Sequence, residues 1–252
     1  MVLTRIIAAT MFLAFTSGLA HAQSAGDALS RLQTAVACAP PPALAPAPVG
    51  LPYIIGGQDV VPRTVFGANE VLVVSGGMSA NLEVGQRYFV RRPMFFGHGL
   101  NGEVPIAQTL GWIRMVSINP DSAVAVVEVA CESMGAGDYL QPFAVPEVPA
   151  GADRVDTSGT PDFAVAARII FGKDRQRTGA EGDFMLIDQG SGDGITPGTR
   201  LAVYRDLGAT NQLLAAIGES IVISTAETTS LIRITSSRTA VETGDYVVPR
   251  KP

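Results

Sequence analysis

Apolar residues in this chain gather in short runs that are separated by glycine, proline and polar positions. Two runs, Glu70–Val74 and Asp183–Ile187, are almost continuously apolar, which is typical of strands covered on both faces. Ala123–Ala130 is rich in valine and alternates, as a half-buried strand does. These runs therefore predict a chain of short strands. Further strands are expected at Arg87–Arg92, Trp112–Ile118, Tyr139–Leu140, Arg200–Arg205, Glu219–Ser224, Leu231–Thr235 and Tyr246–Val248.

The strand pattern occurs twice. Gly137-Asp138-Tyr139 and Gly244-Asp245-Tyr246 lie 107 positions apart, and Gly111 and Gly218 are separated by the same number. Earlier blocks align in the same order, with offsets of 113 and 115 that change only where loops differ. The aligned blocks begin at Ile54 and Ile169, Val71 and Phe184, and Val84 and Pro197, and they place Arg92 opposite Arg205. The chain is thus two copies of one unit, at about 52–145 and 164–252.

Each unit contains five or six short strands without a helical period between them. This pattern predicts an all-β protein of two tandem small barrels or sandwiches. Glycine tolerates positive φ, and aspartate bonds nearby backbone, so each Gly-Asp-Tyr is expected to turn the chain into its last strand. Turn chemistry accounts for Asp138 and Asp245 more simply than a catalytic role does.

The segments outside the units are of a different kind. Residues 1–22 have the basic start, apolar core and Ala20-His21-Ala22 cleavage site of a secretory signal peptide. Residues 23–51 combine a short amphipathic helix, carrying Leu29, Leu32 and Val36 with Asp27 as a possible cap, and a proline-rich extended spacer. Residues 146–163 read as an ordinary linker. We expect an exported protein, periplasmic or associated with the outer membrane, with no integral membrane segment once the leader is removed.

Composition narrows the classes of function. Without the leader, which carries one arginine and no acid, the chain has 17 basic and 23 acidic side chains, a balance that disfavours nucleic acid. His98 is the one histidine after the leader, too few for the usual zinc site, and no cofactor is expected. The serine-hydrolase elbow and the phosphate-binding loop are both absent from the sequence. Asp188–Gly194 resembles neither a nucleotide-binding turn nor a calcium loop closely enough, and a turn between strands is preferred.

The candidate binding residues lie where the two copies diverge. A glycine-rich connection in unit 1 carries Phe95, Phe96 and His98, and Arg91 and Arg92 flank it. Aromatic and arginine side chains in such a loop are typical of a recognition surface. The alternatives are that Phe95 or Phe96 plugs an open end of the barrel, and that the arginines are solvated or paired with acids.

Cys38 and Cys131 are the two cysteines of the chain. In an oxidising compartment they are expected to form a disulfide that ties the N-terminal segment to the end of unit 1. Two separate thiols, or a bond to another chain, are the alternatives.

The motif blocks Gly182 to Gly190, Gly194 to Arg205, Ile217-Gly218-Glu219 and Gly244 to Val247 resemble a known module. It is the β-rich C-terminal module of bacterial cell-envelope proteins, including LysM-type peptidoglycan-binding proteins and flagellar assembly protein T. The resemblance implies a non-catalytic module for docking or assembly, with an envelope protein or peptidoglycan as partner. The alternatives are a peptidoglycan- or glycan-binding module, which should show an aromatic platform, and a hydrolase, for which no nucleophile–base pair is evident.

Overall fold

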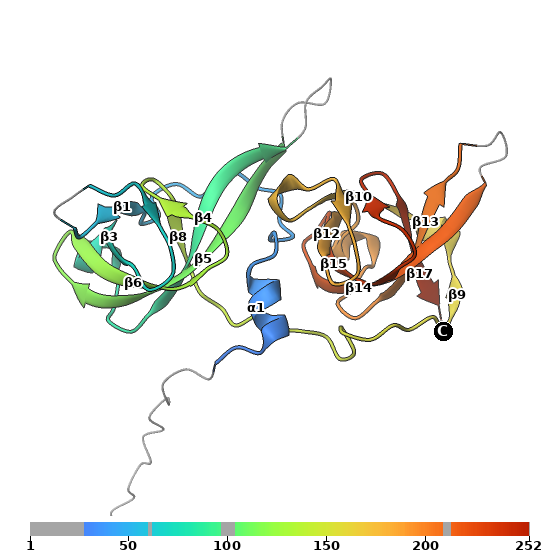
Figure 1. Cartoon of the computed structure of the whole chain (residues 1–252), viewed down its shortest axis with the longest axis horizontal. Coiled ribbons are helices and arrows are strands. Elements are labelled where there is room, and N and C mark those ends of the chain that lie inside the picture. The colour runs from blue at the N-terminus through green and yellow to red at the C-terminus, as the bar shows by residue number, and fades with distance from the viewer. Residues whose placement is uncertain (1–27, 60–61, 97–103, 209–212, 252) are drawn as a thin grey trace, which may run out of the picture.

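The computed structural model describes residues 28–59, 62–96, 104–208 and 213–251. It is an all-β protein in which two small barrels lie side by side, with one short helix at the place where they meet (Figure 1). The predicted fold class is therefore confirmed.

The first barrel is one antiparallel sheet with strand order β1-β3-β6-β5-β4-β8. A bridge between Tyr53 and Tyr139 brings its two edges together. The strands are β1 (Ile54–Gly57), β3 (Val71–Ser75), β4 (Arg87–Phe96), β5 (Val104–Ile118), β6 (Ser122–Ala130) and β8 (Tyr139–Pro142), and β2 (Val65–Phe66) pairs separately with β7 (Met134–Gly135).

The second barrel repeats this order as β10-β12-β15-β14-β13-β17, and β10 pairs with β17 to close it. A seventh short strand, β9, adds to β17. The strands are β9 (Thr160–Pro161), β10 (Ala167–Gly172), β12 (Phe184–Ile187), β13 (Arg200–Asp206), β14 (Leu214–Thr225), β15 (Ser230–Ser237) and β17 (Tyr246–Lys251), and β11 (Thr178–Gly179) pairs with β16 (Val241–Glu242). Short 3-10 turns lie at Gly77–Ala80, Phe163–Val165, Lys173–Arg175 and Ser191–Asp193.

Irregularities in the ladders are duplicated along with the strands. The β4–β5 pairing shifts between Val90 and Arg91, and the β13–β14 pairing shifts between Val203 and Tyr204. In each case the shift falls between the two residues that precede the aligned arginine, which is Arg92 in unit 1 and Arg205 in unit 2. Because a bulge is a specific feature of a strand pair rather than a defect, its recurrence supports the duplication.

Each Gly-Asp-Tyr closes its barrel in the same way. Gly137 and Gly244 take φ of 89° and 93°, a region that glycine enters without steric cost. The carbonyl of Asp138 then accepts from Ile54 N at 2.9 Å, which fastens the turn to β1. The equivalent bond in the second barrel joins Asp245 O to Ile169 N at 3.0 Å. The predicted turn is thus present in both units.

Each barrel has its own apolar core, and strand coverage differs between the copies. In β12, Met185 and Ile187 face the core of barrel 2 while Leu186 packs in the junction between the barrels. In β3, Leu72 and Val74 are buried but Val71 is 40% exposed. The expectation of a strand covered on both faces is therefore right for β12 and wrong for β3, because only the second barrel turns that face toward its neighbour.

The hairpin strands are longer than the sequence pattern predicted. Pro93–Phe96 belongs to β4, where Met94 pairs with Ile106 and Phe95 with Pro105. The predicted loop therefore begins later, and Phe95 and Phe96 lie on a strand. Pro93 is tolerated because β8 pairs with β4 only as far as Arg91, so the edge of β4 beyond that point is open.

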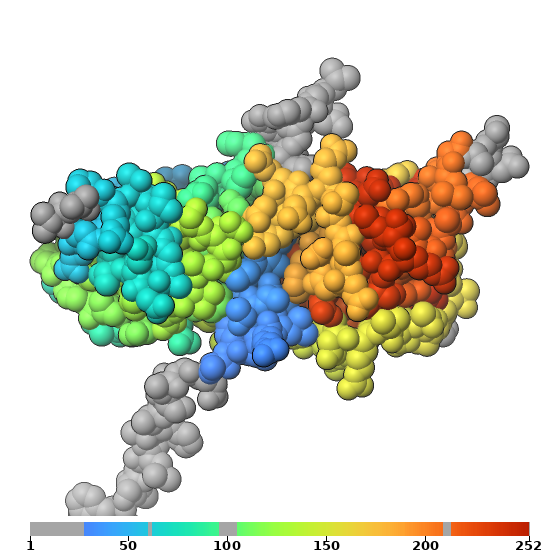
Figure 2. Space-filling view, in the orientation of Figure 1, coloured from blue at the N-terminus to red at the C-terminus, as the bar shows by residue number. Residues whose placement is uncertain are grey.

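The N-terminal segment packs between the two barrels. The helix α1 (Arg31–Ala37) is capped by Ser30, whose Oγ accepts from Gln33 N at 3.1 Å, and Asp27 lies outside the described residues. Ala37 packs on barrel 1, whereas Leu32 and Val36 face the cluster that includes barrel 2. Figure 2 shows this segment, in blue, between the green and orange barrels.

The predicted spacer and linker are both packed against barrel 2. Thr229 donates a hydrogen bond to the carbonyl of Pro42, and Ala39 is buried in the junction cluster. Arg233 donates to Ala152 O at 2.7 Å, and Ala152 is 1% exposed. Their proline, glycine and alanine content led to the expectation of a free spacer and an ordinary linker, but small and apolar residues can also lie flat on a barrel.

Candidate binding site at the junction of the barrels

The predicted disulfide is present and marks the junction. Cys38 is the C-terminal cap of α1, and Cys131 follows β6 directly, with their Cα atoms 5.6 Å apart. The bond fixes the end of the helix to barrel 1. Neither of the two alternatives, separate thiols or a bond to another chain, holds in this structure.

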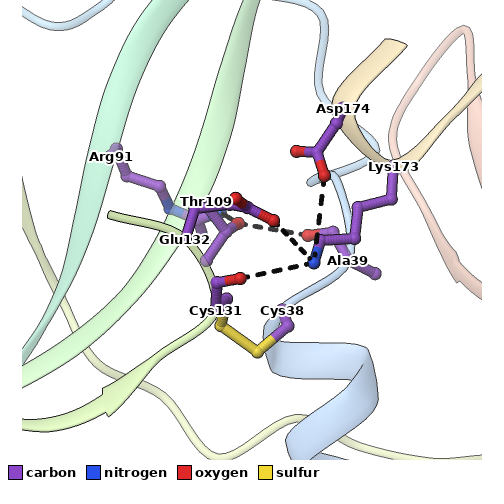
Figure 3. The surroundings of a disulfide bond; sticks show 8 residues. All are labelled: Cys38, Ala39, Arg91, Thr109, Cys131, Glu132, Lys173 and Asp174. Atoms are coloured by element: carbon purple, nitrogen blue, oxygen red, sulfur yellow. Dashed lines mark hydrogen bonds and ion pairs between the residues drawn. A yellow bond between two sulfur atoms is a disulfide. The ribbon is translucent and has the colours of Figure 1, made fainter. Parts of the chain in front are cut away.

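Barrel 2 reaches the disulfide through the turn Lys173–Arg175 (Figure 3). Lys173 Nζ lies 3.0 Å from a carboxylate oxygen of Glu132 and 3.4 Å from Cys131 O. Gln108 of β5 donates to Asp174 Oδ1 at 2.5 Å. Asp174 holds a left-handed backbone with φ of 53°, which is uncommon outside glycine. Polar contacts from a strained turn thus connect the second barrel to the first beside the disulfide.

Arg91 lies in the interior next to this contact. It is 8% exposed, and its guanidinium carbon lies 4.6 Å from the centre of the Phe89 ring. One Nη donates to Thr109 Oγ1, and Thr109 in turn donates to Ala39 O at 3.1 Å. Burial lowers the pKa of Arg91 to about 10, with the Tyr139 phenol opposing that shift, so the group is charged at neutral pH.

The Nε of Arg91 has no hydrogen-bond partner among the residues that the structure describes. A buried donor in that state is uncommon, because the desolvation of the group is not compensated. This atom belongs to a side chain that also lines a cavity.

The cavity has a volume of about 760 Å³ and lies between the barrels. Its walls are formed by the N-terminal segment, Phe89 and Arg91 of β4, the connection after β8 and one face of barrel 2. Most of the lining is apolar, and its charged members among the described residues are Arg91 and Glu147. A cavity of this size is in the range of small-molecule sites. Its apolar walls include Val36, Pro41, Phe89, Val148, Ile223 and Leu231.

Arg92 has a different role from the one that its place in the sequence suggested. Its Nε and Nη2 donate to the two oxygens of Asp138, both at 2.8 Å, and Asp138 Oδ2 also accepts from Gly135 N at 2.6 Å. The bonds to Asp138 raise the pKa of Arg92. Arg205 and Asp245 repeat the pair at 2.9 and 2.7 Å. Arg92 is therefore paired with an acid, which was the alternative to a role in binding.

Of the three remaining predicted binding residues, the structure describes one side chain. Phe95 is 57% exposed near the end of the β4–β5 hairpin, so it does not plug the barrel. The side chain of Phe96 and all of His98 lie outside the described residues. The structure thus separates the predicted group, with Arg91 buried at the junction, Arg92 in a closing pair and Phe95 on the surface.

The second barrel carries exposed apolar residues at the equivalent hairpin. Leu207 and Leu213 are 56% and 57% exposed, and Leu207 N donates to Leu213 O at 3.0 Å across the hairpin. Figure 1 shows that β4–β5 and β13–β14 extend from the same side of the molecule. This pair is not among the predicted binding residues, because those residues lie where the two copies differ in sequence.

In the described part of the chain, the aromatic residues around the tryptophan form no open sugar-binding platform. Trp112 is 4% exposed and packs edge-on to Phe89, with ring centres 6.4 Å apart, and against Phe143 at 5.3 Å. Its indole face is therefore buried under α1 rather than open to a ligand.

The acidic turn Asp188–Gly194 is structural. Asp193 Oδ2 accepts from Gly190 N at 2.9 Å within the 3-10 turn, and the space where a Gly190 side chain would lie is filled by the carbonyl oxygens of Ala226 and Glu227. Among the described residues, no group of three or more histidine, cysteine or acidic side chains is placed to hold a metal ion.

No model of a known protein family matches the chain, and no curated protein matches it significantly. Its function is therefore argued from its own residues.

Proposed function

We propose that this protein is a non-catalytic module exported to the cell envelope, where it docks onto an envelope protein through the ends of the β4–β5 and β13–β14 hairpins. The observation that carries the proposal is that Phe95, Leu207 and Leu213 are large apolar side chains exposed at the two hairpins, and that both hairpins extend from the same side of the molecule (Figure 1). Aromatic residues, phenylalanine included, are enriched in protein interfaces, which makes Phe95 the first candidate contact.

The base of each hairpin is firmly held. Arg92 lies on the same strand as Phe95, and Arg205 lies two residues before Leu207. Each arginine is bonded to the aspartate of its closing turn. A hairpin fixed at its base loses less conformational entropy on binding than a free loop does. This supports a docking surface in preference to a loop that only connects strands.

The proposed compartment rests on covalent chemistry and on the leader. An intramolecular disulfide such as Cys38–Cys131 is typical of proteins in oxidising compartments. No helix in the described part of the chain is both long and apolar enough to cross a membrane. The resemblance of its motif blocks to envelope modules points in the same direction.

The test is capture of an envelope protein by the full chain in its own cells. A photo-crosslinking residue at position 95 or 213 should form a covalent product with the same envelope protein. Phe95→Ser together with Leu207→Ser should reduce the product formed from position 213 at least tenfold. Val84→Ser is the matched control, because Val84 is 65% exposed but lies beyond the opposite end of β4. Equal crosslinking from position 84, or none from 95 and 213, would contradict docking through the hairpins.

Peptidoglycan binding is the alternative, and purified sacculi distinguish it. Retention of the chain on sacculi that have been stripped of protein would contradict the docking proposal and support a glycan-binding module. We expect the chain to remain in the unbound fraction, since Trp112 is buried.

A further inference from the structure

Three arginine side chains of this protein bind a carboxylate through the same edge of the guanidinium. Each offers Nε and Nη2 to the two carboxylate oxygens, at distances between 2.6 and 2.9 Å. The pairs are Arg92 with Asp138, Arg205 with Asp245, and Arg250 with Glu219. This two-bond geometry is the strongest that arginine makes with a carboxylate.

Arg91 differs from these three arginines. Among the described residues its Nη1 donates to Thr109, and its Nε has no hydrogen-bond partner. The Phe89 ring attracts the cation but offers no hydrogen-bond acceptor. A cation that is 8% exposed and has no acidic partner among the described residues is costly, because its desolvation is not compensated.

The cavity next to Arg91 offers space for a ligand that carries a hydrogen-bond acceptor. Its walls are mainly alanine, valine, proline, leucine and isoleucine, with the hydroxyls of Ser224 and Thr225 among the neutral polar groups. Glu147, the acidic residue in the lining, is exposed. One positive charge in such an apolar space fits a monoanion with an apolar body, whereas a dianionic phosphate would call for more than one counter-charge.

We propose that the cavity between the barrels binds an amphiphilic carboxylate, with the carboxylate on the Nε edge of Arg91 and the apolar body along the proline and aliphatic walls. Nε has almost no surface open to solvent in this conformation, so binding requires the Arg91 side chain to turn that edge toward the ligand. The site goes beyond the docking function, because it lies at the junction and not on the hairpin ends.

The mature, disulfide-bonded protein provides its own probe. Trp112 is the single tryptophan, and it packs against Phe89, which lines the cavity, so its fluorescence reports on ligand entry. Dodecanoate and dodecanol, used below the concentration at which they aggregate, differ only in the group that would meet Arg91. We expect dodecanoate to bind about ten- to a hundredfold more tightly than dodecanol, the range of a hydrogen bond to a charged group.

Two variants test the charge of Arg91 and the free volume of the cavity separately. Arg91→Gln should remove the preference for dodecanoate and leave dodecanol binding unchanged. Ala150→Phe, which places a bulky side chain on an exposed position of the wall and keeps Trp112 as the single tryptophan, should weaken both probes at least tenfold without altering Arg91, and it serves if Arg91→Gln fails to fold. Glu147→Gln is the control and should keep or increase the preference for dodecanoate, because it removes only a negative charge.

Equal affinity of the wild-type protein for the two probes would overturn the proposal. So would a preference that persists in Arg91→Gln, or unchanged dodecanoate binding in Ala150→Phe. None of these results would affect docking through the hairpins, which is measured by crosslinking in cells.

Discussion

Two arginine–aspartate pairs hold the closing turns of the barrels. Asp138 accepts from Arg92 and from Gly135 N, and its side chain is 5% exposed. Asparagine keeps one acceptor oxygen and replaces the other with an NH2 group, so at least one of these donors loses its acceptor. We predict that Asp138→Asn lowers the free energy of unfolding by about 2–3 kcal/mol, measured by urea denaturation.

The matched control for this substitution is Asp59→Asn. Asp59 also pairs with an arginine, Arg63, at 2.9 Å, but both side chains are about half exposed. A surface pair contributes about 0–1 kcal/mol, so this variant should stay close to wild type. Equal losses from Asp59→Asn and Asp138→Asn would show that the closing pair has no special role.

At this scale the sequence was informative only in part. The alignment placed Arg92 opposite Arg205 and Asp138 opposite Asp245, so the two pairs could have been inferred from the repeat alone. The burial of Arg91 could not, because it depends on the bulge between Val90 and Arg91 and on the N-terminal segment that covers it. A shift of one position in a ladder changes the face on which a side chain lies, and hydrophobic patterning does not show where a bulge falls.

Among the elements, α1 depends most on its covalent tie. The helix has seven residues, too few to be stable alone, and the disulfide and the two barrels hold it in place. We predict that the double variant Cys38→Ser, Cys131→Ser unfolds with a free energy about 2–5 kcal/mol lower than wild type, as expected for a loop with a sequence separation of 93.

Thermal melts with and without reductant check this prediction. Reductant should lower the melting temperature of the wild-type protein and leave that of the double variant unchanged. Intact mass of the exported protein after alkylation should show no modified thiols. Two alkylated cysteines would contradict the disulfide itself.

The short strand β9 depends on a charged contact. Lys251 Nζ lies 2.5 Å from Asp162 Oδ2, and this bond is the main cause of the lowered pKa of Asp162. Because the folded pKa lies below the unfolded value of 3.8, the contribution is present above about pH 4 and is lost as the pH falls through the folded value.

We therefore predict that the β9–β17 contact opens on acidification before the barrels unfold. Amide exchange at Thr160 and Asp162 should speed up at about pH 3 relative to pH 6, after correction for intrinsic rates. In Asp162→Asn the protection should already be low at pH 6 and should change little with pH. Protection in wild type that does not depend on pH would contradict this role of Asp162.

The strands show how much of the secondary structure a pattern of apolar residues predicts. The pattern of apolar residues and turns predicted part of every strand of the two barrels except β1, β10 and the short β9, because burial in a barrel imposes an apolar pattern. The ends of the hairpins and the packing of residues 146–163 were missed, since proline and glycine indicate breaks in a strand but not whether the chain beyond the break lies on a protein surface.

The whole molecule is organised around the junction. The N-terminal segment contacts both barrels, the disulfide ties it to the first, and the connection after β8 lies along the second (Figure 2). Each barrel could be predicted from its own repeat, whereas the cavity between them could not, because its walls combine residues of the N-terminal segment, β4, the connection after β8 and barrel 2. Both proposals depend on the barrels keeping one arrangement.

A pulsed electron resonance measurement of the distance between the two hairpins tests this arrangement most directly. Spin labels would be attached through non-natural residues at positions 95 and 213, which are exposed in wild type and leave both cysteines intact. The structure predicts one narrow distance distribution, which broadens when the double cysteine variant carries the same labels. A broad distribution in the disulfide-bonded protein would show two independently moving barrels and would contradict a fixed two-hairpin surface.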